Sequence, residues 1–151
     1  MRRLPWAVWP AAFGLAFGVW AWPQVAWQFG PAPTVMVARR TPGLANLPTL
    51  TRRVADPAVV QALYADIETL PPFPRGTISC PIDFGVEWVL RFYRGSEPLL
   101  TADLQAGGCG AATLEPGGGP PRWTMTGSGP SLWRDLGRAL NLSPRALRGV
   151  P

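Results

Sequence analysis

Two runs of alternating residues, 86–94 and 98–105, constrain the fold of this 151-residue chain more than any other feature. Their regularly spaced apolar positions are Trp88, Leu90, Phe92, Leu100, Ala102 and Leu104. In both runs these positions alternate with a second, mostly polar set, which is typical of half-buried strands. The short stretch 95–97 (Gly-Ser-Glu) joins the runs, so we predict an antiparallel hairpin.

The pleat of the hairpin also predicts its register. The two apolar sets lie on the same face of the hairpin only if the two residue numbers of each cross-strand pair add up to an even number. A slip by one residue would move every side chain of one strand to the other face. A three-residue loop meets this condition. It places Phe92 opposite Leu100 and Trp88 opposite Leu104, and it brings the flanking cysteines, Cys80 and Cys109, toward the open end of the hairpin.

The amino-terminal residues, 1–30, have the composition of a membrane segment or a signal peptide. Arg2 and Arg3 precede an uncharged apolar stretch of 19 residues, 4–22, close to the ~20 residues that a membrane-spanning helix needs. Tryptophans lie near both ends of this stretch, and the arginines favour a cytoplasmic amino terminus with an exported remainder. We expect an uncleaved anchor in the cell membrane or a cleaved signal peptide that leaves the domain secreted; a soluble core helix is a third alternative.

The two cysteines are interpreted together with this export signal. Converging cysteines in an exported chain favour a disulfide between Cys80 and Cys109. The chain contains no histidine, so a zinc site would have to form from two thiolates alone, and a nucleophilic cysteine would have no histidine base. We therefore predict a structural disulfide.

The remaining segments predict a small α+β domain over residues 34–142, after a linker at 31–33. Asp56 is a good N-cap and Pro57 suits a first helical turn, so a helix is expected to follow. A second amphipathic helix is expected near the end of the domain, and the tail 143–151 is expected to be flexible. Strands are predicted at 34–40 and 49–55, with one more short strand after residue 110. The predicted fold is an antiparallel sheet of about 4–6 strands with two amphipathic helices.

Composition excludes several kinds of chemistry. All 14 positively charged side chains are arginine, and neither lysine nor histidine is present. Schiff-base chemistry on lysine, a histidine base and histidine metal ligands are therefore excluded. The arginines occur singly or in pairs, so no basic stripe for nucleic acid is predicted. The D-F-G at 83–85 lacks the lysine that kinase chemistry requires. We predict no catalytic residue, cofactor or metal site.

The chain resembles a loosely defined family over residues 34–142. The order of "DPAVVQALYADIETLPPFP", "CPIDFGVEWVLRFYRG", "GGCGAATL" and "LWRDLGRALNL" is similar to uncharacterised, lipoprotein-like extracytoplasmic proteins of Gram-positive bacteria. The resemblance implies a secreted or surface-attached bacterial α+β domain and no known activity. The chain differs from lipoproteins because residues 20–30 contain no cysteine to carry a lipid.

These patterns predict a non-catalytic extracytoplasmic domain, membrane-tethered or secreted. Its expected partners are the membrane, through the amino-terminal helix, and an extracytoplasmic protein, a cell-wall polymer or a small ligand. Two alternatives are a secreted protease-inhibitor-like module and a carboxylate-dependent hydrolase. The hydrolase would use Asp83, Glu87 or Asp103, and it requires carboxylates that converge in a concave pocket.

Overall fold

The computed structural model describes residues 32–44, 47–127 and 130–148. The chain divides into two units, Met1–Pro31 and Ala32–Pro151, and every described residue belongs to the second unit. The predicted membrane or signal segment lies outside the described residues. Within the described ranges, no helix combines the length and hydropathy that crossing a membrane requires.

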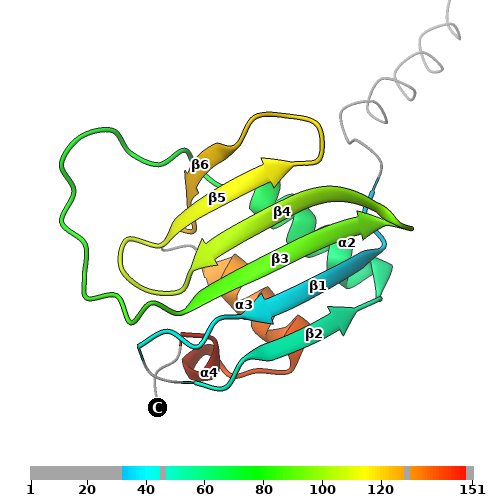
Figure 1. The fold of residues 1–151 in the computed structure, drawn as a ribbon, viewed down its shortest axis with the longest axis horizontal. Coiled ribbons are helices and arrows are strands. Elements are labelled where there is room, and N and C mark those ends of the chain that lie inside the picture. The colour runs from blue at the N-terminus through cyan, green and yellow to red at the C-terminus, as the bar shows by residue number, and fades with distance from the viewer. Residues whose placement is uncertain (1–31, 45–46, 128–129, 149–151) are drawn as a thin grey trace, which may run out of the picture. The chain divides into compact units, whose positions relative to one another are not determined.

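Six strands form one antiparallel sheet with the order β2-β1-β3-β4-β5-β6 (Figure 1). The strands are β1 (Val35–Arg40), β2 (Leu50–Val54), β3 (Glu87–Arg94), β4 (Glu97–Gln105), β5 (Ala111–Pro116) and β6 (Arg122–Met125). Each strand pairs antiparallel with its neighbours. The predicted α+β class and antiparallel sheet are confirmed, with the strand number at the upper end of the predicted range.

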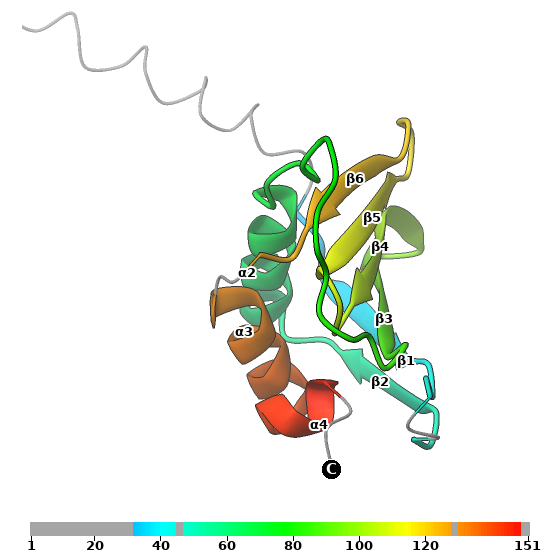
Figure 2. The ribbon, with the colours of Figure 1, turned by 90° about the vertical axis from the view of Figure 1, so that its left-hand side faces the viewer.

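The helices cover one face of this sheet and leave the other face open (Figure 2). They are α2 (Pro57–Glu68), α3 (Pro130–Leu140) and α4 (Pro144–Arg148). The first two are the predicted amphipathic helices, whereas α4 occupies part of the stretch that was expected to be a flexible tail. Leu147 of α4 is fully buried in the core, so this part of the tail belongs to the packed domain.

Helix α2 begins and packs as its sequence predicts. The Asp56 carboxylate accepts hydrogen bonds from the backbone N–H groups of Ala58 and Val59, at 3.0 and 3.4 Å. This cap satisfies two donors that the first helical turn would otherwise leave without partners. The buried positions of the helix are Val60, Leu63 and Ile67. Their spacing forms a single apolar stripe against the sheet.

The hairpin of β3 and β4 has the predicted register over most of its length. The predicted pairs are all present: Trp88 with Leu104, Leu90 with Ala102, and Phe92 with Leu100. The turn is shorter than predicted, because the register shifts between Phe92 and Tyr93 and lets Arg94 pair with Glu97. The bulge absorbs one residue, so the apolar sets still share the face under the helices.

After the hairpin the structure contains two strands, β5 and β6, where the sequence predicted one. Strand β6 has only four residues, and its buried side chain is Thr124 rather than an apolar residue. Its outer edge is paired: the Phe73 N–H donates to the Trp123 carbonyl at 3.1 Å, and the Met125 N–H donates to Pro71 at 2.9 Å. The segment after α2 therefore covers an edge that would otherwise be open to another strand.

Candidate functional site

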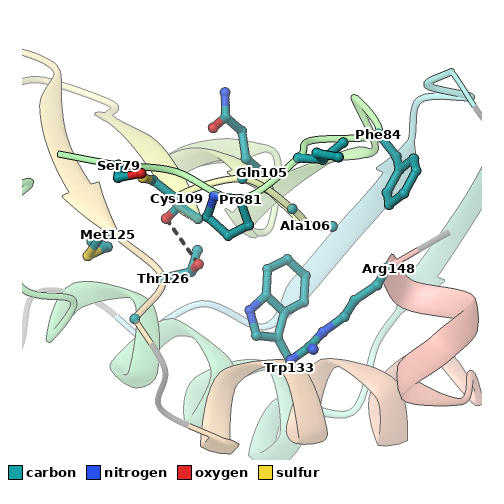
Figure 3. Close-up of a pocket in the computed structure, with 15 residues that line it drawn as sticks. Ser79, Pro81, Phe84, Gln105, Ala106, Cys109, Met125, Thr126, Trp133 and Arg148 are labelled. Carbon is teal, nitrogen blue, oxygen red and sulfur yellow. Dashed lines mark hydrogen bonds between the residues drawn. The ribbon is translucent and has the colours of Figure 1, made fainter. Parts of the chain in front are cut away.

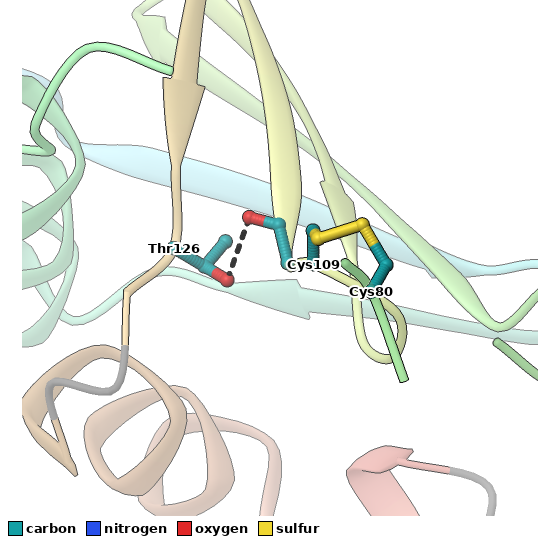
Figure 4. Close-up of a disulfide and its surroundings, with 4 residues drawn as sticks. Cys80, Cys109 and Thr126 are labelled. Atoms are coloured by element: carbon teal, nitrogen blue, oxygen red, sulfur yellow. Dashed lines mark hydrogen bonds between the residues drawn. A yellow bond between two sulfur atoms is a disulfide. The ribbon is translucent and has the colours of Figure 1, made fainter. Parts of the chain in front are cut away.

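The predicted disulfide between Cys80 and Cys109 is present, with the two Cα atoms 4.8 Å apart (Figure 4). Backbone pairing of the hairpin extends outward as far as the hydrogen bond from the Ala106 N–H to the Val86 carbonyl, at 2.9 Å. Residues 74–85, which precede β3 and which we call the bridged loop, have no regular secondary structure. The disulfide joins this loop to the turn between β4 and β5.

The bridged loop also packs closely on that turn. The Asp83 carboxylate accepts a hydrogen bond from the Gly85 N–H at 2.9 Å. A Cβ atom at Gly107 would lie only 2.8 Å from the Asp83 Oδ1 atom, and Gly108 has a φ of +58°. Glycines are therefore needed where the turn meets Asp83, because a side chain there would clash or adopt a strained backbone. The contacts of Asp83 with Gly85 and with the turn therefore give this carboxylate a structural role in the bridged loop.

A pocket of about 580 Å³ opens beside the disulfide (Figure 3). It lies between the bridged loop, the β4–β5 turn, the end of β6, and helices α3 and α4. Its main side chains are Pro81, Phe84, Met125, Thr126, Trp133 and Arg148. The pocket is thus lined mostly by apolar and aromatic side chains, with a few polar groups, as small-molecule sites commonly are.

Two side chains give the pocket its chemical character. Trp133 points from α3 into the pocket (Figure 3), although only 7% of its surface is exposed. Arg148 is the one charged side chain among the described residues that line the pocket, and its guanidinium forms no hydrogen bond or ion pair with any residue that the structure describes. The Thr126 hydroxyl donates to the Gly110 carbonyl at 3.0 Å, which fixes the floor near the disulfide. The pocket therefore offers an aromatic surface and a positive charge.

Helix α4, which carries Arg148, is held by two buried side chains of the sheet. The Trp88 indole N–H donates to the Leu147 carbonyl at 2.9 Å, and the Arg40 guanidinium donates to the Ala146 carbonyl at 3.1 Å. The Arg40 guanidinium lies 5.8 Å from the Trp88 ring centroid, a favourable cation–π distance. These contacts fix one wall of the pocket.

Exposed apolar side chains lie on the bridged loop where it lines the pocket, and one more lies next to the loop. Ile82 is 81% exposed and Phe84 49% exposed, both on the bridged loop. Leu44, which is 82% exposed, is adjacent because its N–H donates to the Phe84 carbonyl at 2.7 Å. Apolar side chains gathered at one place on a surface are a common mark of a binding site.

The carboxylates proposed for a hydrolase lie elsewhere. Asp83 is turned toward Gly107, whereas Glu87 and Asp103 lie on the open face of the sheet. None of the three lines the pocket. Within the described part of the chain, no group of three histidine, cysteine or acidic residues could hold a metal ion.

Comparison with protein-family models, with curated proteins and with solved structures finds no match for this chain. Trp133 lies in the second predicted amphipathic helix, and Arg148 lies in the stretch 143–151 that was predicted to be a flexible tail. No local signal could have joined them, because the pocket forms only when α4 docks on the sheet.

Proposed function

We propose that this chain is a non-catalytic extracytoplasmic domain that binds a small amphipathic anion in the pocket beside the disulfide. The observation that carries the proposal is the lining of the pocket: among the residues that the structure describes, it has aromatic and apolar walls, one arginine, and no carboxylate or free thiol. Such a lining can hold and orient a ligand, but it contains none of the carboxylate, imidazole, amine or thiol groups that usually act as general acids or bases. A binding role is therefore favoured over hydrolysis.

The dimensions and polarity of the pocket favour a particular ligand class. Its volume of about 580 Å³ lies inside the roughly 300–1,000 Å³ that is typical of small-molecule sites. The exposed part of the Trp133 indole offers an apolar contact across the pocket from Pro81 and Phe84 (Figure 3). Arg148 favours a carboxylate, sulfonate or phosphate, because a guanidinium can form two parallel hydrogen bonds to such a group. A compact aromatic carboxylate combines both features.

The binding test uses 2-naphthoate as the probe, with 2-naphthylmethanol as an uncharged counterpart. In isothermal titration calorimetry with the full chain, we expect one molar equivalent of 2-naphthoate to bind and the alcohol to bind more weakly. The variant Arg148→Gln should weaken naphthoate binding about tenfold or more, because a charge-assisted hydrogen bond contributes roughly 1.5–3 kcal/mol. Arg145→Gln, on the same helix but outside the pocket, is the matched control.

Two outcomes contradict the pocket proposal. One is the absence of binding of either probe at millimolar concentration. The other is equal loss of naphthoate affinity in Arg145→Gln and Arg148→Gln, which would assign the effect to net charge alone.

The bridged loop supports a second candidate, a protease-inhibitor-like module. Ile82 is highly exposed on a loop that a disulfide fixes at Cys80, and an inhibitor presents an exposed side chain on a rigid loop in this way. The test is inhibition of a subtilisin-type protease that accepts apolar residues. An Ile82–Asp83 peptide bond that stays intact after long incubation, together with inhibition that the Ile82→Asp variant loses, would support this role. Cleavage of the bond without inhibition of the protease would contradict it.

We also propose that the domain acts outside the cytoplasm, attached to the cell membrane or secreted after cleavage. The proposal rests on Arg2 and Arg3 before the apolar stretch 4–22, and the disulfide fits an oxidising compartment. A reporter fused after Pro151 should lie outside the cytoplasm. Its presence in the membrane fraction would favour an anchor, its release without residues 1–30 would favour a signal peptide, and a cytoplasmic reporter would contradict export.

A further inference from the structure

The uncovered face of the sheet carries six charged side chains of both signs. They are Arg39, Arg53, Glu87, Arg91, Asp103 and Glu115, which the strand register places opposite the helix-covered face (Figure 2). None of them forms an ion pair with any residue in the described ranges, although four other ion pairs occur there. Six charges without intramolecular pairs on one open face suggest that their partners lie on another molecule.

The two signs are separated across the sheet. Arg53 is on β2 and Arg39 on β1, whereas Asp103 is on β4 and Glu115 on β5; the central strand β3 carries one charge of each sign. Arginines and carboxylates also lie in the same cross-strand rows, where a row is a line of residues paired side by side across neighbouring strands. Arg39 and Asp103 are both opposite Val89 of β3. In the next row, Arg53 and Glu115 lie two strands to either side of β3.

We propose that a second copy of this chain covers this face, related by a two-fold axis that runs along β3. A rotation about such an axis keeps each row in place and exchanges the two halves of the sheet. It brings Arg39 onto Asp103 of the other copy and Arg53 onto Glu115, in an isologous sheet-on-sheet contact. Val89 of each copy meets its equivalent near the axis, and so do Glu87 and Arg91, whose like-charge contacts weaken the association.

Charge balance favours a second copy over a polyanion as the occupant. The face has three arginines and three carboxylates, so a nucleic acid or an anionic polymer would be repelled by half of it. Asp103 supports the same conclusion. Burial and the neighbouring Glu115 raise its pKa, whereas Arg91 lowers it. An arginine of a second copy would supply a further positive charge next to this carboxylate.

The size of the face indicates a weak association. The axis on β3 overlaps five strands of each copy, β2 to β5 in sheet order, and strands about 4.8 Å apart and about five residues long give a projected area of roughly 400 Å² per copy. Two such faces together come to roughly 800 Å², below the ~1,000 Å² that a specific, stable interface buries. We therefore expect dissociation in the micromolar range, weakened further by salt because the pairs are charged.

The test is sedimentation equilibrium of the full chain in a density-matched detergent. The wild type should dimerise at tens of micromolar. Arg53→Glu and Glu115→Arg should each weaken dimerisation at least tenfold, and the double exchange should restore it to within about threefold. Arg52→Glu is the matched control, because Arg52 neighbours Arg53 on β2 but points to the helix-covered face. A wild type that stays monomeric at 100 µM, or single reversals without effect, would overturn the proposal.

A second measurement tests the position of the axis. Val89→Cys should give a covalent dimer under mild oxidation, because Val89 lies next to its own equivalent across a two-fold axis on β3. Thr113→Cys, in the same row on β5, should not, because it faces β2 of the other copy. Cross-linking through Thr113→Cys and not through Val89→Cys would refute this axis.

Discussion

Removing the Cys80–Cys109 disulfide should destabilise the domain by an amount that can be worked out from the chain. The bridge joins residues 29 positions apart. The chain-entropy estimate for a closed loop of that length is about 3.6 kcal/mol at 25 °C. A domain of this size typically has about 5–15 kcal/mol of total stability, so the loss is a large fraction of it.

This free energy corresponds to a readily measured change in melting temperature. Unfolding entropy of about 2.1 cal/mol/K per residue gives roughly 0.25 kcal/mol/K for the 120 residues from Ala32 to Pro151. The double variant Cys80→Ser/Cys109→Ser should therefore melt about 14 °C below the wild type. Because Pro81 and Phe84 on the same loop line the pocket, naphthoate affinity should fall as well.

The assay is differential scanning calorimetry of the full chain, oxidised and reduced. Reduction of the wild type makes the same covalent change without a substitution, so it serves as the control and should give a similar shift. A decrease below about 3 °C in both samples would show that the bridged loop is held by its other contacts. A decrease in the serine variant alone would mean that the substitutions, not the missing bond, cause the loss.

Three further predictions concern single side chains. Asp56→Ala should cost about 1 kcal/mol in urea unfolding through loss of the α2 cap, whereas Asp56→Asn should cost much less. Arg40→Met should leave the Ala146 carbonyl without its donor and lower stability by about 1–3 kcal/mol; faster amide exchange in α4 would locate the loss. Burial and Glu115 raise the pKa of Asp103, so its proton stabilises the fold below pH ~3.9 and this contribution disappears as pH rises through the raised pKa. Asp103→Asn should remove that pH dependence and leave stability at pH 7 equal or higher.

The parts of the fold that the sequence predicts are those with local determinants. Alternation in 86–94 and 98–105 is enough for the hairpin and its register, and Asp56 with Pro57 marks the start of α2. The disulfide could be predicted because it lies just beyond a hairpin whose register was already known. In each case the residues that decide the structure are close in sequence or are paired by a single turn.

The parts that could not be predicted depend on contacts between distant residues. Arg40 and Ala146 are 106 positions apart, and Trp88 and Leu147 are 59 apart. A charged residue such as Arg40 is expected to face solvent. Here it is buried because backbone carbonyls and an aromatic ring surround its guanidinium. Helix α4, and with it Arg148 in the pocket, therefore has no signature in its own five residues.

The bridged loop, which lines the pocket, has features that favour a role in binding. The regular ladder stops at Val86 and Ala106, and residues 74–85 carry the chain from the outer edge of β6 to the start of β3. This loop exposes Ile82 and Phe84 and is fixed covalently at Cys80. Exposed apolar side chains contribute little to stability, whereas a rigid apolar loop lowers the entropy that a ligand must overcome on binding. A loop that is both apolar and fixed is therefore better explained by recognition than by folding.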